Sequence, residues 1–256
     1  MALKLDPNYA DAYCMRGILY KSLEQYDEAL IDFNKAIELS PLNFSYFANR
    51  AALFLDINEY EKALSDSNYA VQLNPNSGKA LYLLGSAYVK MGDYDRALDN
   101  IGKAIILEAD NSEFYHQRGN AYYYMSNYEK ALDDYNKALT MNSMIYEYYY
   151  DRALTYASLN QYQRAIDDFS KALEINPTGT NILRNRGTCY YNIQNYQAAL
   201  KDYNTAIDLN PNDSDFYNNR GMIYQRLAEQ TTDQTLREEY KSKANEDLEM
   251  ARRFTQ

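Results

Sequence analysis

The side chains that most often perform catalysis or bind metals are scarce in this sequence. His116 is the only histidine among 256 residues, so a Ser-His-Asp or Cys-His arrangement has one place to form, and multi-histidine metal sites are excluded. Cys14 and Cys189 have no CxxC partner, and the glycines form neither GxGxxG nor a P-loop. The chain is therefore predicted not to be an enzyme and to hold no cofactor and no metal.

Arginine and aspartate recur together in a way that indicates a structural role. Five aspartates follow an arginine by sixteen residues, and in one further copy Leu84 and Asn100 replace both partners. The pairs are Arg16 and Asp32, Arg50 and Asp66, Arg118 and Asp134, Arg152 and Asp168, and Arg186 and Asp202. Asp247 follows Arg220 by 27 residues, which is the same spacing plus an 11-residue insertion. These positions lie at one level in an antiparallel helix pair, so we expect a salt bridge between the two helices of each pair.

The whole sequence repeats with a step of 34 residues. Tyr20 recurs as an aromatic residue in six later copies, and Ala29 and Ala36 recur as alanine in five. The five prolines all occupy one place in the repeat: Pro7, Pro41, Pro75, Pro177 and Pro211. Such self-similarity predicts an elongated array in which each repeat is stabilised by packing on its neighbours.

The unit from Ala10 to Asn43 resembles the tetratricopeptide repeat. The family pattern, W-x2-L-G-x2-Y followed by A-x3-F and P, falls on Tyr13, Arg16, Gly17, Tyr20, Ala29, Phe33 and Pro41. Tyr13 and Arg16 are departures, because the family often has Trp and Leu there. The resemblance covers almost the whole chain. It implies an all-α, right-handed α-solenoid, a superhelix of stacked antiparallel helix pairs.

The period predicts the boundaries of the units. We expect repeats at 10–43, 44–77, 78–111, 112–145, 146–179 and 180–213, and a seventh at 214–256 with the insertion and a C-terminal capping helix. Residues 1–9 align with the end of the second helix of a preceding repeat, which predicts a piece of a longer protein. A signal peptide, an anchor or a catalytic domain upstream therefore stays open.

Two local features support this reading. Five of the nine glycines recur inside the first helix, at Gly17, Gly85, Gly119, Gly187 and Gly221, where each costs about 1 kcal/mol relative to alanine. The other copies have alanine, so we expect a close approach of two helices at this place.

In the last helix, Thr235 to Glu238 has the form of a capping box. The surface of this helix outside its apolar face is polar, which predicts a terminal cap, with a docking helix for a partner as the alternative.

The net charge and hydropathy of the chain limit the classes of partner that it is expected to bind. The net charge of -10 opposes attraction to nucleic acid or to anionic membrane surfaces, and no apolar run is long enough to span a bilayer. Cys14 and Cys189 lie in distant repeats, which indicates a reducing compartment, so a cytoplasmic location is expected.

A peptide-binding groove is the predicted functional site. In the family that this chain resembles, the exposed face of the first helices lines a channel for an extended peptide or a helix. That face is rich in tyrosine and asparagine in repeats three to six, which suits contact area and hydrogen bonds to a peptide backbone. The predicted site residues are Lys79, Tyr82, His116, Asn120, Tyr123, Tyr124, Tyr150, Arg184, Asn185, Tyr191, Asn192 and Asn219.

The sequence therefore predicts a non-enzymatic protein-interaction scaffold that binds a peptide or helix of a protein partner. One alternative is the substrate-selecting repeat region of a larger enzyme, such as a glycosyltransferase, or of a signalling protein. Another is a self-associating array, with end-to-end contact through the N-terminal repeat.

Overall fold

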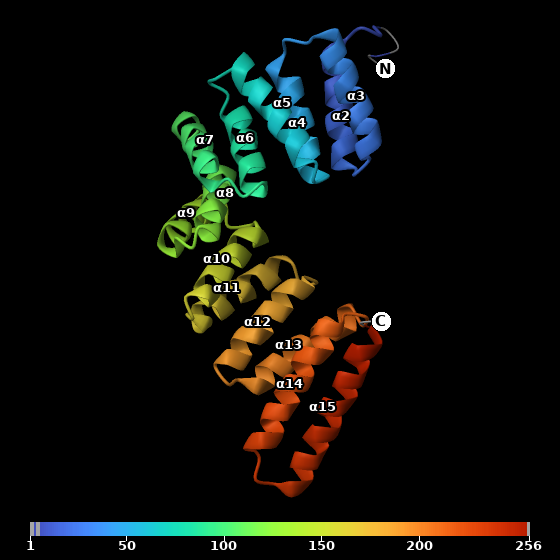
Figure 1. The fold of residues 1–256 in the computed structure, drawn as a ribbon, viewed down its shortest axis with the longest axis vertical. Coiled ribbons are helices and arrows are strands. Elements are labelled where there is room, and N and C mark those ends of the chain that lie inside the picture. Colours follow the sequence, from blue (N-terminus) through green and yellow to red (C-terminus); the bar gives the residue numbers. More distant parts are fainter. Residues whose placement is uncertain (1–2, 4–5, 255–256) are drawn as a thin grey trace. The chain divides into compact units, whose positions relative to one another are not determined.

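The computed structural model of the chain describes residues 3 and 6–254, and the regular elements α2 to α15 among them are all α-helices. The chain divides into two compact units, the first ending at Met141 and the second beginning at Asn142. Each unit is a stack of helix pairs in chain order (Figure 1), so the all-α fold of stacked pairs is confirmed.

The helices are paired as the period predicts. The first unit contains α2 (Ala10–Ser22) with α3 (Tyr26–Leu39), α4 (Phe44–Asp56) with α5 (Tyr60–Leu73), α6 (Gly78–Lys90) with α7 (Tyr94–Leu107), and α8 (Ser112–Tyr124) with α9 (Tyr128–Met141). The second unit contains α10 (Tyr146–Ser158) with α11 (Tyr162–Ile175), α12 (Thr180–Asn192) with α13 (Tyr196–Leu209), and α14 (Ser214–Gln230) with α15 (Gln234–Phe254). The predicted helix end within residues 1–9 falls partly on 1–2 and 4–5, outside the described residues.

The turn inside each of the first six pairs has one conformation. A residue with positive φ stands at the same repeat position in all six: Glu24, Asn58, Gly92, Ser126, Asn160 and Gln194. In the first pair the next amide, that of Gln25, donates to the carbonyl of Tyr20 at 2.9 Å, and the bond recurs in the other five. This is a Schellman motif, in which a left-handed residue lets the backbone bond back across the last helical turn. It reverses the chain and makes the pair antiparallel.

The second helices end at one repeat position whether or not a proline follows. The helices α3, α5, α11 and α13 end two residues before a proline, as predicted. The helices α7 and α9 end at the equivalent residues although Ala109 and Ser143 stand in the place of proline. Packing of the next pair therefore also determines where these helices stop.

The core of each pair lies at the recurring alanines and at one large side chain of the second helix. Ala29, Phe33 and Ala36 are fully buried, as are many of their equivalents. A Cβ atom on Gly17 would lie 2.8 Å from the Phe33 ring, and one on Gly119 would lie 2.7 Å from the Tyr135 ring. The predicted close approach at these glycines is confirmed, and packing explains why glycine is used there despite its low helix propensity.

The predicted arginine-aspartate pairs are present in six helix pairs. In each, the guanidinium donates two hydrogen bonds to one carboxylate, at 2.6 to 2.9 Å. The pair of Arg220 and Asp247 confirms the position of the insertion. In the copy without the pair, Leu84 is buried and the Asn100 amide donates to the carbonyl of Arg96. The paired aspartates are buried beneath their arginines, so the pairs fix the level of the two helices.

The seventh pair differs from the others in length and in its outer surface. The inserted residues extend both helices and form the loop at 231–233. The capping box predicted at Thr235 is wrong, because the Asp233 carboxylate accepts the bond from the Leu236 amide and thus caps α15. The apolar side chains of α15 are at least half-buried in the unit, with Tyr240 stacked on Tyr224. This helix therefore leaves no exposed apolar stripe for a partner, and its role as a terminal cap stays a prediction.

Candidate functional site

The predicted site residues all lie on the first helix of a pair, namely on α6, α8, α10, α12 and α14. We call the surface of these helices that carries the predicted site residues the groove face. Lys79 and Tyr82 are on α6, and His116, Asn120, Tyr123 and Tyr124 are on α8 of the first unit. Tyr150 is on α10, Arg184, Asn185, Tyr191 and Asn192 are on α12, and Asn219 is on α14 of the second unit. The structure thus divides the predicted site into two groups, each of which belongs to one unit.

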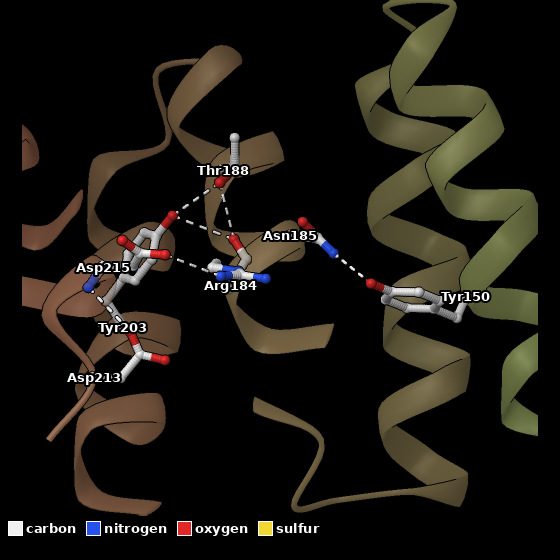
Figure 2. A network of polar contacts seen from close by, with 7 residues as sticks. All are labelled: Tyr150, Arg184, Asn185, Thr188, Tyr203, Asp213 and Asp215. Atoms are coloured by element: carbon white, nitrogen blue, oxygen red, sulfur yellow. Dashed lines mark hydrogen bonds and ion pairs between the residues drawn. The ribbon is translucent and has the colours of Figure 1, made fainter. Parts of the chain in front are cut away.

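A polar network spans the groove face of the second unit (Figure 2). The Asn185 amide on α12 donates to the Tyr150 hydroxyl on α10 at 2.9 Å. On the other side of α12, the Arg184 guanidinium donates to the Asp215 carboxylate on α14 at 3.3 Å. These contacts connect three successive first helices, α10, α12 and α14, across the groove face.

A pocket of about 180 Å³ opens on this face between α12 and α14. It is lined by Thr188, Tyr191, Asn192, Tyr203, Asn219, Met222 and Ile223. The Tyr203 ring and Ile223 are buried and belong to the core, whereas Met222 is 49% exposed. The hydroxyls of Thr188 and Tyr203 lie 2.9 Å apart, and Tyr203 also donates to the Arg184 carbonyl (Figure 2). The pocket therefore has apolar walls and a few polar atoms.

Three predicted residues, Tyr191, Asn192 and Asn219, line this pocket, and the first two also contact neighbouring residues. The Tyr191 hydroxyl accepts from the Arg226 guanidinium at 3.1 Å, and its ring lies against Tyr196. The Asn192 amide donates to the Thr188 carbonyl. Asn219 stands opposite on α14. Amide groups that face a partly apolar pocket can bond to a peptide backbone.

In the first unit, Lys79 belongs to a polar cluster over three first helices. Its ammonium donates to the Asn49 side-chain oxygen at 2.7 Å, and the Asn49 amide donates to the Cys14 sulfur at 3.1 Å. Desolvation lowers the pKa of Lys79, with repulsion from Lys21 adding to it. Lys79 is exposed, and its bond to Asn49 continues through Asn49 to Cys14, so the cluster connects α2, α4 and α6.

The next predicted residues of the first unit, Tyr82, His116 and Asn120, also contact side chains of neighbouring helices. Tyr82 donates to the Glu113 carboxylate and stacks on Phe114 at 4.9 Å between ring centroids. The Asn120 side-chain oxygen accepts from Tyr135, and the His116 ring lies 5.8 Å from the same tyrosine. These contacts link α6, α8 and α9.

Tyr123 and Tyr124 form an aromatic cluster at the end of α8. Tyr124 is 59% exposed and stacks on Tyr94, and Tyr123 lies between Tyr124 and Tyr128. A second pocket, of about 400 Å³, is bounded by Tyr94, Asn120, Tyr124 and Lys90, among others. The volume of this pocket is larger than that of the pocket between α12 and α14, and more of its lining is polar.

The two cysteines of the chain, Cys14 and Cys189, are buried. Burial raises the pKa of the Cys189 thiol to about 11 and that of Cys14 above its ordinary value, so both are protonated at neutral pH. Within residues 3 and 6–254, no three His, Cys, Asp or Glu side chains are grouped to hold a metal ion. In the same part of the chain no helix has the length and apolar character needed to cross a bilayer.

Sequence reasoning missed Tyr203 and Ile223 as pocket residues, whereas the helical period placed Met222 on the groove face without including it among the predicted site residues. Tyr203 occupies the repeat place of Phe33, which reads as a core position, and Ile223 occupies that of Leu19. One signal in the sequence could have indicated the role of Tyr203. Tyr135 and Tyr203 are tyrosines at the core position that Phe33 occupies in the first repeat. A hydroxyl added there must reach a polar partner, and both reach the groove face.

Stacked antiparallel helix pairs with small residues at the helix crossing define an α-solenoid of helical repeats. The sequence profile of the tetratricopeptide repeat matches residues 10–43, 112–144, 146–178 and 181–213, and a second profile of the same repeat matches 68–99 and 202–252. The chain belongs to the tetratricopeptide repeat family, whose fold is that of a protein-interaction scaffold rather than a catalytic domain.

Solved structures of the family are similar to this chain. A tetratricopeptide repeat protein from Parabacteroides merdae has a TM-score of 0.64 at 17% identity and covers 95% of this chain and 98% of its own. A chain of the APC/C hetero-tetramer Cut9-Hcn1 has a TM-score of 0.73 at 16% identity over 98% of this chain, which spans half of that one. YrrB, described as having an unusual peptide-binding site, has a TM-score of 0.54 at 26% identity and covers 70% of this chain and 92% of its own.

One curated relative is an enzyme. A UDP-N-acetylglucosamine–peptide N-acetylglucosaminyltransferase of Giardia intestinalis is 45% identical over 42 residues. That stretch is 16% of this chain and 3% of the transferase, so the match covers little more than one repeat.

Proposed function

We propose that this protein binds an extended peptide segment of a protein partner on the groove face of its second unit. The pocket between α12 and α14 receives one side chain of that peptide. This pocket is the observation that carries the proposal. Its volume of about 180 Å³ is below the roughly 300–1,000 Å³ of sites that enclose a small molecule, but it suits a single apolar side chain.

The surroundings of the pocket suit a peptide backbone. Asn192 and Asn219 offer amide groups on the rim, and Tyr191 offers a ring held in place by Arg226. Rigid tyrosines contribute contact area with little loss of conformational entropy, and the network of Tyr150, Asn185 and Arg184 keeps the helices in position. YrrB, a family member with a described peptide-binding site, supports the same class of ligand.

Selection of peptides from a random phage-displayed library on the full chain tests the proposal. We expect selected peptides to share an apolar anchor residue, and Met222→Glu to weaken their binding at least about tenfold, because a carboxylate would line the pocket. Ile106→Glu is the matched control, since Ile106 is 82% exposed on α7 and far in sequence from the pocket. Circular dichroism melts verify that both variants are folded. Selected peptides that bind Met222→Glu as tightly as the unaltered chain would refute the site.

A second candidate function is the selection of substrates for a larger enzyme. The match to the Giardia transferase favours it, although it covers only 42 residues. Sequencing of the gene on both sides of these 256 codons tests this candidate, because it requires a catalytic domain in the same reading frame. The cytoplasmic location stays a prediction, which cell fractionation would test.

A further inference from the structure

The pocket of about 400 Å³ between α6 and α8, which we call the first-unit pocket, lies at the same repeat positions as the pocket between α12 and α14. Four positions, three repeats apart, line both pockets: Val89 and Tyr191, Lys90 and Asn192, Gln117 and Asn219, and Asn120 and Met222. Each unit therefore has one pocket at an equivalent place, and the side chains at the shared positions determine what each pocket accepts.

The two pockets differ in charge and polarity. Lys90 contributes an ammonium group where the second unit has the neutral amide of Asn192. Asn120 contributes an amide where the second unit has the thioether of Met222. The residues that line the first-unit pocket include no aspartate and no glutamate. The first-unit pocket is thus positively charged, whereas the lining of the other pocket carries no charge.

Lys90 differs from other cations of the groove face because its ammonium has no partner in the fold. The others bond to neighbouring side chains: Lys79 to Asn49, Arg184 to Asp215, and Arg226 to Glu229. Lys90 is exposed, and within residues 3 and 6–254 its ammonium has neither an ion-pair partner nor a hydrogen-bond acceptor. Asp93, the nearest carboxylate in the sequence, is bound by Arg96. The ammonium of Lys90 is therefore available to an anionic ligand.

The amides of the first-unit pocket are oriented so that a second donor is available. The Tyr135 hydroxyl donates to Asn120 Oδ1 at 2.7 Å, which identifies the oxygen of that amide. Asn120 Nδ2 lies 3.5 Å from Gln117 Oε1, so Gln117 Nε2 is directed away from Asn120. In the described part of the chain, Gln117 Nε2 donates to no acceptor. Lys90 and Gln117 thus provide two donors at one pocket, which matches the two oxygens of a carboxylate.

Apolar groups form the remaining walls of the first-unit pocket. The rings of Tyr94 and Tyr124 stack with their centroids 5.6 Å apart, and Val89 is buried beside them in the lining. Walls of this kind can pack against the methylene groups of a side chain whose charged end reaches Lys90. An acidic side chain with a methylene stem therefore fits the lining better than a purely apolar one.

We infer that the first-unit pocket is a second binding site, which accepts a glutamate side chain of a peptide segment of a protein partner. The glutamate carboxylate accepts hydrogen bonds from Lys90 Nζ and Gln117 Nε2, and its methylene groups pack on Tyr94 and Tyr124. This site belongs to the first unit and does not require the pocket between α12 and α14. The chain would thus select an acidic residue in one unit and an apolar residue in the other.

Selection of peptides from a random phage-displayed library, with depletion on Lys90→Glu, isolates peptides that depend on this pocket. Depletion removes every phage that binds elsewhere on the chain, including the pocket between α12 and α14. We expect the remaining peptides to share a glutamate. Display through the C-terminus of each peptide leaves no free terminal carboxylate, so such a glutamate reports a side-chain contact.

Synthetic, C-terminally amidated copies of a selected peptide measure the contact by fluorescence anisotropy. Replacement of the shared glutamate by glutamine should weaken binding to the unaltered chain about fivefold, as for an ion pair near the surface. The same replacement should leave binding to Lys90→Gln unchanged, because the partner charge is already absent. Lys137→Gln is the matched control, since Lys137 is an exposed lysine of α9 that does not line the pocket. It should bind as the unaltered chain does.

Three results would overturn the proposal. They are a failure to recover peptides that depend on Lys90, recovered peptides without a shared glutamate, and an equal loss on glutamate replacement in the unaltered chain and in Lys90→Gln. Circular dichroism melts verify that all variants are folded. Loss of the site between α12 and α14 would leave these measurements unchanged, so the two proposals fail separately.

Discussion

At the scale of single residues, the arginine-aspartate pairs position the two helices of a repeat relative to each other. The arginine of each bridging pair is held by both oxygens of a buried carboxylate and lies against aromatic rings, as Arg16 does between Tyr13 and Tyr20. The hydrogen bond with Asp134 raises the pKa of Arg118, which keeps it charged at all physiological pH values. The same geometry recurs in six pairs, so its role is to set the level of two helices.

Replacement of one partner in such a pair should destabilise the fold more than replacement of both. Arg118→Leu leaves the Asp134 carboxylate buried without its guanidinium, which should lower the free energy of unfolding by about 3 kcal/mol. The double variant with Asp134→Asn should recover most of this loss, because it reproduces the natural combination of Leu84 and Asn100. Urea unfolding of the two single variants and the double variant gives the coupling energy. Strictly additive losses would contradict the bridging role.

At the scale of elements, the turn between the helices of a pair determines how the chain reverses. Six turns have a left-handed residue at the same place, and only one of these residues is glycine, Gly92. A side chain in this conformation costs about 1–2 kcal/mol. The turns at Glu24, Asn58, Ser126, Asn160 and Gln194 are therefore formed with a strained residue that the packed helices hold in place.

Two opposite substitutions at the left-handed position of this turn should change the free energy of unfolding in opposite directions. Ser126→Gly should raise the free energy of unfolding by about 0.5–1 kcal/mol, because it removes the conformational cost. Gly92→Ala should lower it by about 1 kcal/mol, since a Cβ there meets no atom within 4 Å and the loss is conformational alone. Thermal unfolding monitored by circular dichroism measures both. Shifts of the same sign in the two variants would show that the turn conformation is not what limits stability.

At the scale of the whole molecule, the two terminal helices differ in what they expose. The first helix exposes Met15, Leu19 and Leu23, and the last exposes Asn245 and Arg252 where other repeats have aliphatic residues. In the other repeats those aliphatic residues pack on the following pair, as Ile37 does on Phe47, so α15 presents a polar surface at places where the other second helices are apolar.

The sequence by itself determined the helix pairs, the six bridging pairs and the need for small residues at the helix crossings. All of these follow from local spacing that recurs every 34 residues, because each repeat packs on its neighbours in the same way. The groove face also followed from periodicity, and all twelve predicted residues lie on first helices.

Tertiary structure determined the surroundings of each of those residues. Lys79 and Tyr82 bond to side chains on other first helices, whereas Asn120 lines the pocket of about 400 Å³ and Asn192 and Asn219 line the pocket between α12 and α14. The pocket also depends on Tyr203 and Ile223, which the pattern reads as core, because an opening between two helices is set by the sizes of facing side chains.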